Sequence, residues 1–262
     1  MKEVEQIAIR GAEVGCHEAL FTLGEYPEDR YDEARRWLDE NGYTSTIDYL
    51  VAACSHVIET SGLLPHANAG ALSHEDLAAL RAVSPSQGMM IESINPTLAA
   101  HRGAPDKEPA RRLATLDAAG QLHIPFTTGI LVGFGEDRQD RIDALEAIAA
   151  SHDRFGHVQE VIVQNFVPKQ DTAMRNAPPC SMEDLIDAIE LARTILPAGV
   201  SVQAPPNLVD DATRLLDAGI NDFGGVSPIT ADHVNPEKPW PSLLTLEEAA
   251  RPECRASAWQ AR

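Results

Sequence analysis

Polar side chains at the ends of short apolar runs are the residues of this 262-residue chain that could do chemistry. The first run ends at Gly24 and Glu25, where a carboxylate beside a flexible glycine could receive a ligand ammonium group. A capped turn would use the same two residues. Glu92 lies among apolar residues, where burying a charge costs free energy unless a polar ligand or a cation pairs with it. An ion pair with a neighbouring strand or exposure at the rim would explain Glu92 equally well.

Neutral amide side chains end three further runs. Asn68 and Asn165 follow two of them, and Gln203 and Asn207 follow a third. Amides suit contacts with a ribosyl group, a carboxylate or a heterocycle, although turn chemistry selects the same residue types. We therefore treat these four residues as candidate ligand contacts.

Acidic and hydroxyl side chains follow the last apolar run, which ends in Asp222 and Ser227, with Asp232 and His233 a few residues later. Asp222, Asp232 and His233 are possible proton-transfer groups. Each of them alone would also fit a structural role.

Motifs for metal or nucleotide binding are missing from the sequence. The four cysteines, Cys16, Cys54, Cys180 and Cys254, are too scattered for a disulfide framework or a CxxC-type metal site, so we predict no metal ligands. Gly133-Phe-Gly135 looks like the start of a dinucleotide loop, but Arg138 stands where that loop requires its third glycine. We expect the two glycines to form an exit turn.

Short apolar runs that alternate with amphipathic stretches must position these residues, and the pattern is typical of βα units around a parallel sheet. The seven predicted strands are 18–22, 63–67, 88–94, 126–132, 160–166, 200–203 and 222–226. The predicted helices are 4–14, 27–40, 46–60, 73–83, 107–119, 138–150, 181–196 and 208–218. Ligands meet the carboxyl ends of parallel strands, so the polar residues should converge on one mouth.

Two kinds of residue mark the helix ends. Ser73 and Ser181 are predicted N-caps, each followed by carboxylates in the first helical turn. Gly42, Gly120 and Gly219 follow helical runs and are expected to close them in the left-handed conformation.

The composition excludes several classes of partner. A formal charge of −19 without a dense basic patch argues against nucleic acid and against an anionic membrane. The start of the chain carries charges where a signal peptide needs an apolar core, and no later stretch approaches a membrane span. We expect a cytoplasmic protein with one domain over residues 1–241 and a divergent tail over residues 242–262.

Seven motifs in this order resemble the radical S-adenosylmethionine FO synthase family, specifically its 7,8-didemethyl-8-hydroxy-5-deazariboflavin synthase half. The resemblance spans roughly residues 11–241. It rests on Glu18-Ala-Leu-Phe-Thr-Leu-Gly-Glu25, Leu64-Pro-His-Ala-Asn68, Gly88-Met-Met-Ile-Glu-Ser93, Gly129-Ile-Leu-Val-Gly-Phe-Gly-Glu136, Gln164-Asn-Phe166, Gln203-Ala-Pro-Pro-Asn-Leu208 and Asp222-Phe-Gly-Gly-Val-Ser-Pro228.

The resemblance implies an enzyme built on a partial TIM-type (β/α) barrel. Its cofactors would be S-adenosylmethionine and a 4Fe-4S cluster, which together generate a 5′-deoxyadenosyl radical. The implied reaction is the cyclisation of a 5-amino-5-(4-hydroxybenzyl)-6-ribitylimino-uracil with loss of ammonia, which gives FO for deazaflavin coenzyme F-420. A companion domain or subunit would join tyrosine to the ribityl-uracil.

By matched position, the resemblance also implies roles for single residues. Gly24 and Glu25 would hold the methionine ammonium group, and Glu92 would face S-adenosylmethionine. Asn68 and Asn165 are assigned to the cofactor and Gln203 and Asn207 to the substrate, all lining the mouth. Asp222 and Ser227 would lie nearer the substrate and are the catalytic candidates.

One motif departs from the family pattern, since the chain lacks the CxxxCxxC loop that holds the cluster after the first strand. We expect an N-terminally truncated chain that lacks the first strand and the cluster loop, is inactive as it stands, and self-associates through an exposed sheet edge. Two alternatives stay open. One is a non-catalytic ligand-binding remnant or subunit, and the other is a cluster-independent barrel lyase that uses Asp222, Asp232 or His233.

Overall fold

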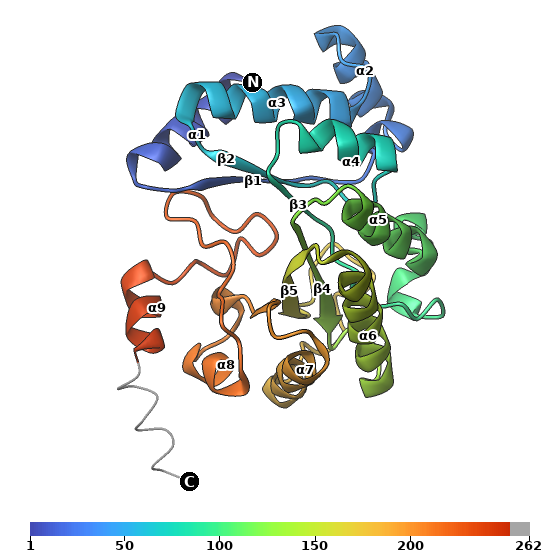
Figure 1. Cartoon of the computed structure of the whole chain (residues 1–262), viewed down its shortest axis with the longest axis vertical. Coiled ribbons are helices and arrows are strands. Elements are labelled where there is room, and N and C mark those ends of the chain that lie inside the picture. The colour runs from blue at the N-terminus through green and yellow to red at the C-terminus, as the bar shows by residue number, and fades with distance from the viewer. Residues whose placement is uncertain (252–262) are drawn as a thin grey trace. The chain divides into compact units, whose positions relative to one another are not determined.

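The computed structural model describes residues 1–251, which form an α/β fold around a six-stranded parallel sheet (Figure 1). The strands are β1 (Glu18–Thr22), β2 (Leu64–Asn68), β3 (Ser86–Gly88), β4 (Phe126–Val132), β5 (Val158–Asn165) and β6 (Ser201–Gln203), in the spatial order β1-β2-β3-β4-β5-β6. The predicted α/β class with a parallel sheet is confirmed.

Most helices lie where the sequence predicts them. The helices are α1 (Lys2–Glu13), α2 (Asp32–Asn41), α3 (Thr46–Ser61), α4 (His74–Arg81), α5 (Pro109–Gln121), α6 (Arg138–Phe155), α7 (Met182–Ile195), α8 (Thr213–Ala218) and α9 (Leu243–Ala250), with short 3-10 turns η1 (Pro27–Asp29), η2 (Ala99–His101), η3 (Pro105–Lys107) and η4 (Pro206–Leu208). The predicted helix 27–40 is divided into a 3-10 turn and a helix, the predicted helix 208–218 begins only at Thr213, and the helix at Leu243–Ala250 was not predicted. Within residues 1–251, none of these helices has the length and apolar character needed to cross a bilayer. Cys254 and the end of the predicted tail lie outside the described residues.

The chain divides into two compact units, each made of several segments. The first contains Met1–Met90, Pro105–Thr127 and Ser151–Val158; the second contains Ile91–Ala104, Thr128–Ala150 and the chain from Gln159 onward. Strands β1, β2 and β3 belong to the first unit and β6 to the second. The expected single domain over residues 1–241 stays a prediction.

Helices α1, α3 and α4 lie on one side of β1 and β2 in the first unit (Figure 1). Successive side chains of a strand point to opposite faces, and Ala19 and Phe21 of β1 pack with Ala8 of α1 and Val57 of α3. Leu20 points the other way and is 60% exposed. The apolar stripe of β1 therefore fixes its helix-covered face, while the predicted self-association stays a prediction.

Two predicted strands differ from the structure. Strand β3 ends at Gly88, and the later part of the predicted strand 88–94 makes one isolated bridge, between Glu92 and Ile130. Glu92 has a φ of +63°, in the left-handed region, which interrupts an extended run. The predicted strand 222–226 is wrong as a strand, because Asp222 makes only one bridge, to Gln203, before its Oδ1 accepts the Gly224 N–H in a tight turn.

The predicted helix ends are confirmed at four of five positions. Ser73 and Ser181 accept hydrogen bonds from the N–H groups of Asp76 and Asp184, and Gly42 and Gly219 close helices with φ values of +78° and +118°. Gly120 is a correction, because it lies inside α5.

Close packing explains Gly120. A Cβ at this position would come within 2.5 Å of the Phe155 ring, so the glycine allows α5 to approach that side chain. The left-handed conformation after α5 is taken by His123, with a φ of +51°.

Two buried histidines of the first unit stay neutral at physiological pH. Burial lowers the pKa of His66, on β2, to about 4, and its Nδ1 lies 2.8 Å from the Ser86 hydroxyl. Burial likewise lowers the pKa of His157 to about 4, beside the rings of Phe126 and Phe155. Protonation of either ring therefore favours the unfolded chain.

We expect the free energy of unfolding to fall as the pH drops from about 6.5 to 4, because the unfolded chain then binds protons that the folded His66 and His157 refuse. The slope is up to about 1.4 kcal/mol per pH unit for each histidine. Urea unfolding across this range should show the slope reduced by about half in His157→Phe. The exposed His74→Gln is the control, and an equal slope in all three proteins would contradict the assignment.

Candidate active site

Glu25 follows β1 in the first unit and is buried in an ion pair. Its carboxylate lies 2.6 Å from Arg111 Nη2 and accepts the Ala71 N–H at 2.8 Å, and only 7% of the side chain is exposed. Gly70 has a φ of +85°, and a Cβ there would lie 2.8 Å from the Glu25 side chain. Glu25 therefore holds the turn after β1 against the turn after β2.

The main chain at Gly24, next to Glu25, is exposed to solvent. Gly24 is exposed, and a Cβ added to it would meet no atom within 4 Å. Asn68 ends β2 beside this turn, and its carbonyl accepts the Leu23 N–H at 3.1 Å. The Gly24 main chain can therefore be reached by a ligand, whereas the Glu25 carboxylate is already engaged.

Glu92 of the second unit is bound to β4 through its main chain. Its N–H donates to the Gly129 carbonyl at 2.9 Å, and its carbonyl accepts the Leu131 N–H at 3.1 Å. Its Oε2 lies 3.0 Å from His101 Nε2, and the His101 ring packs at 5.2 Å from the Phe134 ring. Glu92 and His101 thus form a largely buried carboxylate–imidazole pair.

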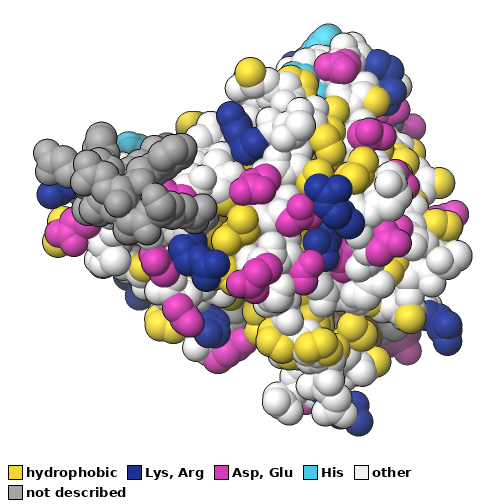
Figure 2. Space-filling model, turned by 90° about the horizontal axis from the view of Figure 1, so that it is seen from below, with side chains coloured by type: hydrophobic (Ala, Val, Ile, Leu, Met, Phe, Trp, Pro, Cys, Tyr) yellow, Lys and Arg dark blue, Asp and Glu magenta, His cyan; other side chains and the backbone are white. Residues whose placement is uncertain are grey.

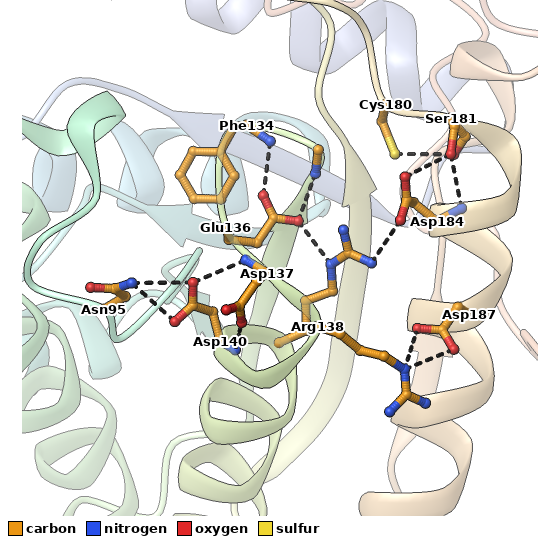
Figure 3. A network of polar contacts seen from close by, with 12 residues as sticks. Asn95, Phe134, Glu136, Asp137, Arg138, Asp140, Cys180, Ser181, Asp184 and Asp187 are labelled. Carbon is orange, nitrogen blue, oxygen red and sulfur yellow. Dashed lines mark hydrogen bonds and ion pairs between the residues drawn. The ribbon is translucent and has the colours of Figure 1, made fainter.

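Glu136 organises the turn after β4 (Figure 3). Its carboxylate accepts the N–H groups of Gly133 and Phe134 at 2.8 and 2.9 Å and pairs with Arg141 Nε at 2.8 Å. Burial alone would lower the pKa of Arg141, but Glu136 and Asp184 outweigh it and raise that pKa. The expected exit turn is confirmed, with φ values of +89° at Gly133 and +119° at Gly135.

The loop that contains Glu92 is tied to α6 by a further contact in Figure 3, where Asn95 Nδ2 donates to both carboxylate oxygens of Asp140 at 3.0 and 3.1 Å. The same side chain stabilises its own loop, since its Oδ1 accepts the Thr97 N–H at 2.9 Å. The Asn95 amide therefore holds the segment after Glu92 in place through both its nitrogen and its oxygen.

Three predicted amides of the second unit lie in buried positions at or just after the ends of strands. Asn165 ends β5, Gln203 ends β6 and Asn207 lies in η4, and each is at most 8% exposed. Asn165 Nδ2 donates to the Leu208 carbonyl at 3.0 Å, so Asn165 contacts η4 directly. The structure therefore brings Asn165 and the turn that carries Asn207 together.

The acidic candidates of the last segment take part in local turns. Ser227 Oγ accepts the Thr230 N–H at 3.0 Å, in a turn much like the one that Asp222 makes with Gly224. Burial would raise the pKa of Asp232, but hydrogen bonds from Asn235 and Asn207 outweigh it and lower that pKa. Asp232 is therefore a carboxylate near neutral pH, whereas the adjacent His233 is exposed.

Three partners of the site residues were not predicted from the sequence. Arg111, His101 and Arg141 pair with Glu25, Glu92 and Glu136. Arg141 lies in the first turn of α6, five residues after Glu136, so their nearness in the sequence was a signal for this pair. Arg111 and His101 had none, because they reach their carboxylates only in the folded chain.

The described residues do not fit a 4Fe-4S cluster. Such a cluster needs several thiolates at one point. Within residues 1–251, no group of three His, Cys, Asp or Glu side chains is arranged to hold a metal ion. The residues above are therefore considered for what they bind and orient.

Sequence comparison finds relatives that are about 50% identical to this chain. The 7,8-didemethyl-8-hydroxy-5-deazariboflavin synthase of Methanosarcina barkeri is 48% identical over 251 residues, which cover 96% of this chain and 76% of that protein. The chain belongs to this synthase family. The family resemblance seen in the motifs is thereby confirmed, although no family model matches the chain.

Longer members of the deazariboflavin synthase family are also similar. FO synthases of Nocardia farcinica and Mycobacterium tuberculosis are 53% and 52% identical to this chain, over 94% and 93% of its length. The chain spans only 29% of each of these proteins.

Two solved structures resemble this chain in fold. Methylornithine synthase (PylB) has a TM-score of 0.64 at 20% identity, over 84% of this chain and 60% of that one. The FeFe-hydrogenase maturase HydG from Carboxydothermus hydrogenoformans has a TM-score of 0.62 at 20% identity, over 82% and 46%. Both similarities support the predicted α/β fold with a parallel sheet.

We predict that Glu136→Gln lowers the free energy of unfolding by about 3 kcal/mol, because it leaves the buried Arg141 without its main counter-charge. Arg138→Gln is a matched control on the same helix, since the Arg138–Asp187 pair is exposed and should contribute less than about 1 kcal/mol. Urea denaturation of the three proteins measures both values. Equal losses in the two variants would show that Glu136 does not organise the turn.

Proposed function

We propose that this chain forms part of an enzyme that carries out the deazaflavin-forming half of FO synthesis. The reaction is the cyclisation of a 5-amino-5-(4-hydroxybenzyl)-6-ribitylimino-uracil with release of ammonia, for the synthesis of coenzyme F-420. The observation that supports it is the 48% identity with the Methanosarcina barkeri synthase over 76% of that protein. Neither alternative, a ligand-binding remnant or a cluster-independent lyase, is favoured by these relatives.

The cofactors that the family implies, S-adenosylmethionine and a 4Fe-4S cluster, would supply radical chemistry when bound. Residues 1–251 do not arrange three thiolates, so we propose that another polypeptide segment holds the cluster. The contribution proposed for the described residues is to bind and orient the two small molecules.

Contacts with S-adenosylmethionine are proposed at Gly24, Glu25 and Asn68 of the first unit and, separately, at Glu92 of the second unit. In this proposal the exposed main chain of Gly24 contacts the methionine group, while Glu25 keeps the turn in place through Arg111. Glu92 offers a carboxylate at a bridge beside β4. Carboxylates of this kind accept hydrogen bonds from hydroxyl and ammonium groups.

The substrate site is proposed at Gln203 and Asn207, with Asp222 and Ser227 as catalytic candidates. Asn165 contacts η4, which carries Asn207, so we group Asn165 with the substrate residues. Asp232 is a poor general acid near neutral pH, because its hydrogen bonds favour the ionised form.

The partners proposed for this chain are small molecules and a companion synthase. The FO synthases that it matches are more than three times as long, which leaves room for the half that joins tyrosine to the ribityl-uracil. On the face shown in Figure 2, Lys and Arg side chains lie scattered among Asp and Glu. The expectation that no nucleic acid binds stays a prediction.

Anaerobic reconstitution with iron and sulfide tests the proposed function. We expect no cluster in this chain alone, and about four irons when it is joined to the part of the Methanosarcina barkeri synthase that it does not match. With S-adenosylmethionine, a reductant and the uracil substrate, the joined protein should release one ammonia for each FO. A joined protein that carries the cluster but releases no ammonia would refute the proposal, and four irons in this chain alone would refute the separate cluster segment.

We predict that Glu92→Gln in the joined, cluster-bearing protein weakens the binding of S-adenosylmethionine about tenfold. The reason is that a neutral amide makes weaker hydrogen bonds than a carboxylate. Glu146→Gln, on the exposed side of α6 in the same unit, should leave the affinity unchanged. Equilibrium dialysis measures the three dissociation constants. Equal values for Glu92→Gln and the unaltered protein would remove Glu92 from the cofactor site.

A further inference from the structure

Asn165 leaves one buried polar atom without a partner. The side chain is 8% exposed, and its Nδ2 donates to the Leu208 carbonyl at 3.0 Å, while its Oδ1 has no hydrogen-bond partner within the described chain. A carbonyl oxygen can only accept, so the NH2 group must face Leu208. The orientation of this amide is thereby fixed, with its oxygen turned away.

Asn207 shows the same arrangement one residue before Leu208. It is 7% exposed, and its Nδ2 donates to Asp232 Oδ2 at 2.9 Å and to the Lys238 carbonyl at 3.2 Å. Both partners are acceptors, because Asp232 is ionised. A reversed amide would place two oxygens together, so Asn207 Oδ1 is the atom left without a partner in residues 1–251.

A third asparagine in the same network shows that such partners can be supplied. Asn235 is 4% exposed, its Nδ2 donates to Asp232 at 2.9 Å, and its Oδ1 accepts from Lys169 Nζ at 2.7 Å. Buried polar atoms are nearly always hydrogen-bonded, and an orphaned acceptor needs an explanation. The two orphaned oxygens, one in η4 and one against it, point to a ligand that brings hydrogen-bond donors.

We infer that Asn165 Oδ1 and Asn207 Oδ1 accept N–H groups of the uracil ring of the substrate and so determine substrate specificity. This inference rests on the proposed function for the identity of the ring. A site whose acceptors stay unpaired discriminates strongly against a ligand that lacks the matching donor. A uracil with its ring N–H groups methylated is such a ligand.

The chemistry of the two amides favours a uracil over an adenine. Asparagine recognises adenine with both amide atoms, the oxygen accepting from the amino group and the NH2 group donating to a ring nitrogen. Here both NH2 groups are already used by Leu208, Asp232 and Lys238. Two acceptors without a free donor match the N–H groups of a uracil ring, whereas the adenine of S-adenosylmethionine would lack its second bond.

Isothermal titration of a 6-ribitylaminouracil into the protein tests the inference. We expect Asn165→Ala and Asn207→Ala each to weaken binding about tenfold, which corresponds to about 1.4 kcal/mol, and S-adenosylmethionine binding to stay unchanged. The ring-N-methylated uracil should bind the unaltered protein at least tenfold more weakly. Asn235→Ala is the matched control, expected to lower the melting temperature without changing the uracil affinity.

The outcomes separate the inference from the proposed function. Unchanged uracil affinity in folded Asn165→Ala and Asn207→Ala, with binding by the unaltered protein, would overturn the inference alone. Loss of S-adenosylmethionine affinity in its place would also overturn the inference, because the oxygens would then serve the cofactor. Absence of uracil binding by the unaltered protein would overturn both. If either alanine variant fails to fold, equal affinity for the methylated and unmethylated uracils would still overturn the inference.

Discussion

A buried polar atom is costly unless it finds a partner, and this constraint shapes the turns that follow the strands. Glu25 pairs with Arg111 and accepts the Ala71 N–H, and Glu136 pairs with Arg141 and accepts two further N–H groups. These carboxylates are therefore paired within the protein and need no ligand to balance their charge. They use their charge to hold the turns after β1 and β4 in one conformation, which a binding site needs before any ligand arrives.

Two of the buried polar atoms that lack a hydrogen-bond partner within residues 1–251 are neutral amide oxygens. Asn165 and Asn207 have their NH2 groups committed to the protein and their oxygens unpartnered. A pair of neutral acceptors suits an uncharged heterocycle better than a cation, because a cation in a buried site needs a formal counter-charge. This agrees with the uracil substrate proposed from the synthase relatives, whereas Glu25 and Glu136 have a mainly structural role.

The local sequence predicted an element well where the element depends on local interactions, such as an alternating apolar pattern or a helix cap. Strands 18–22 and 126–132 match β1 and β4 residue for residue, and the caps at Ser73 and Ser181 form as expected. Gly120 was misread because its reason is contact with Phe155, which no local pattern shows. The strand predicted at 222–226 failed because Asp222 and Gly224 favour a turn over sheet pairing.

The site was predicted only in part, for the same reason. Residue type and position at strand ends singled out Glu25, Glu92, Asn165 and Asn207 as candidates. Which of them is already paired depends on Arg111, His101, Leu208 and Asp232, which meet them only after folding. Amide orientation in particular is set by tertiary partners, so the orphaned oxygens could not be predicted from the sequence.

A crystal structure of the protein soaked with a 6-ribitylaminouracil tests the central claim most directly. The account predicts the uracil ring against η4, with ring nitrogens within about 3.2 Å of Asn165 Oδ1 and Asn207 Oδ1. A uracil bound elsewhere, with both amide oxygens filled by ordered water, would contradict the account.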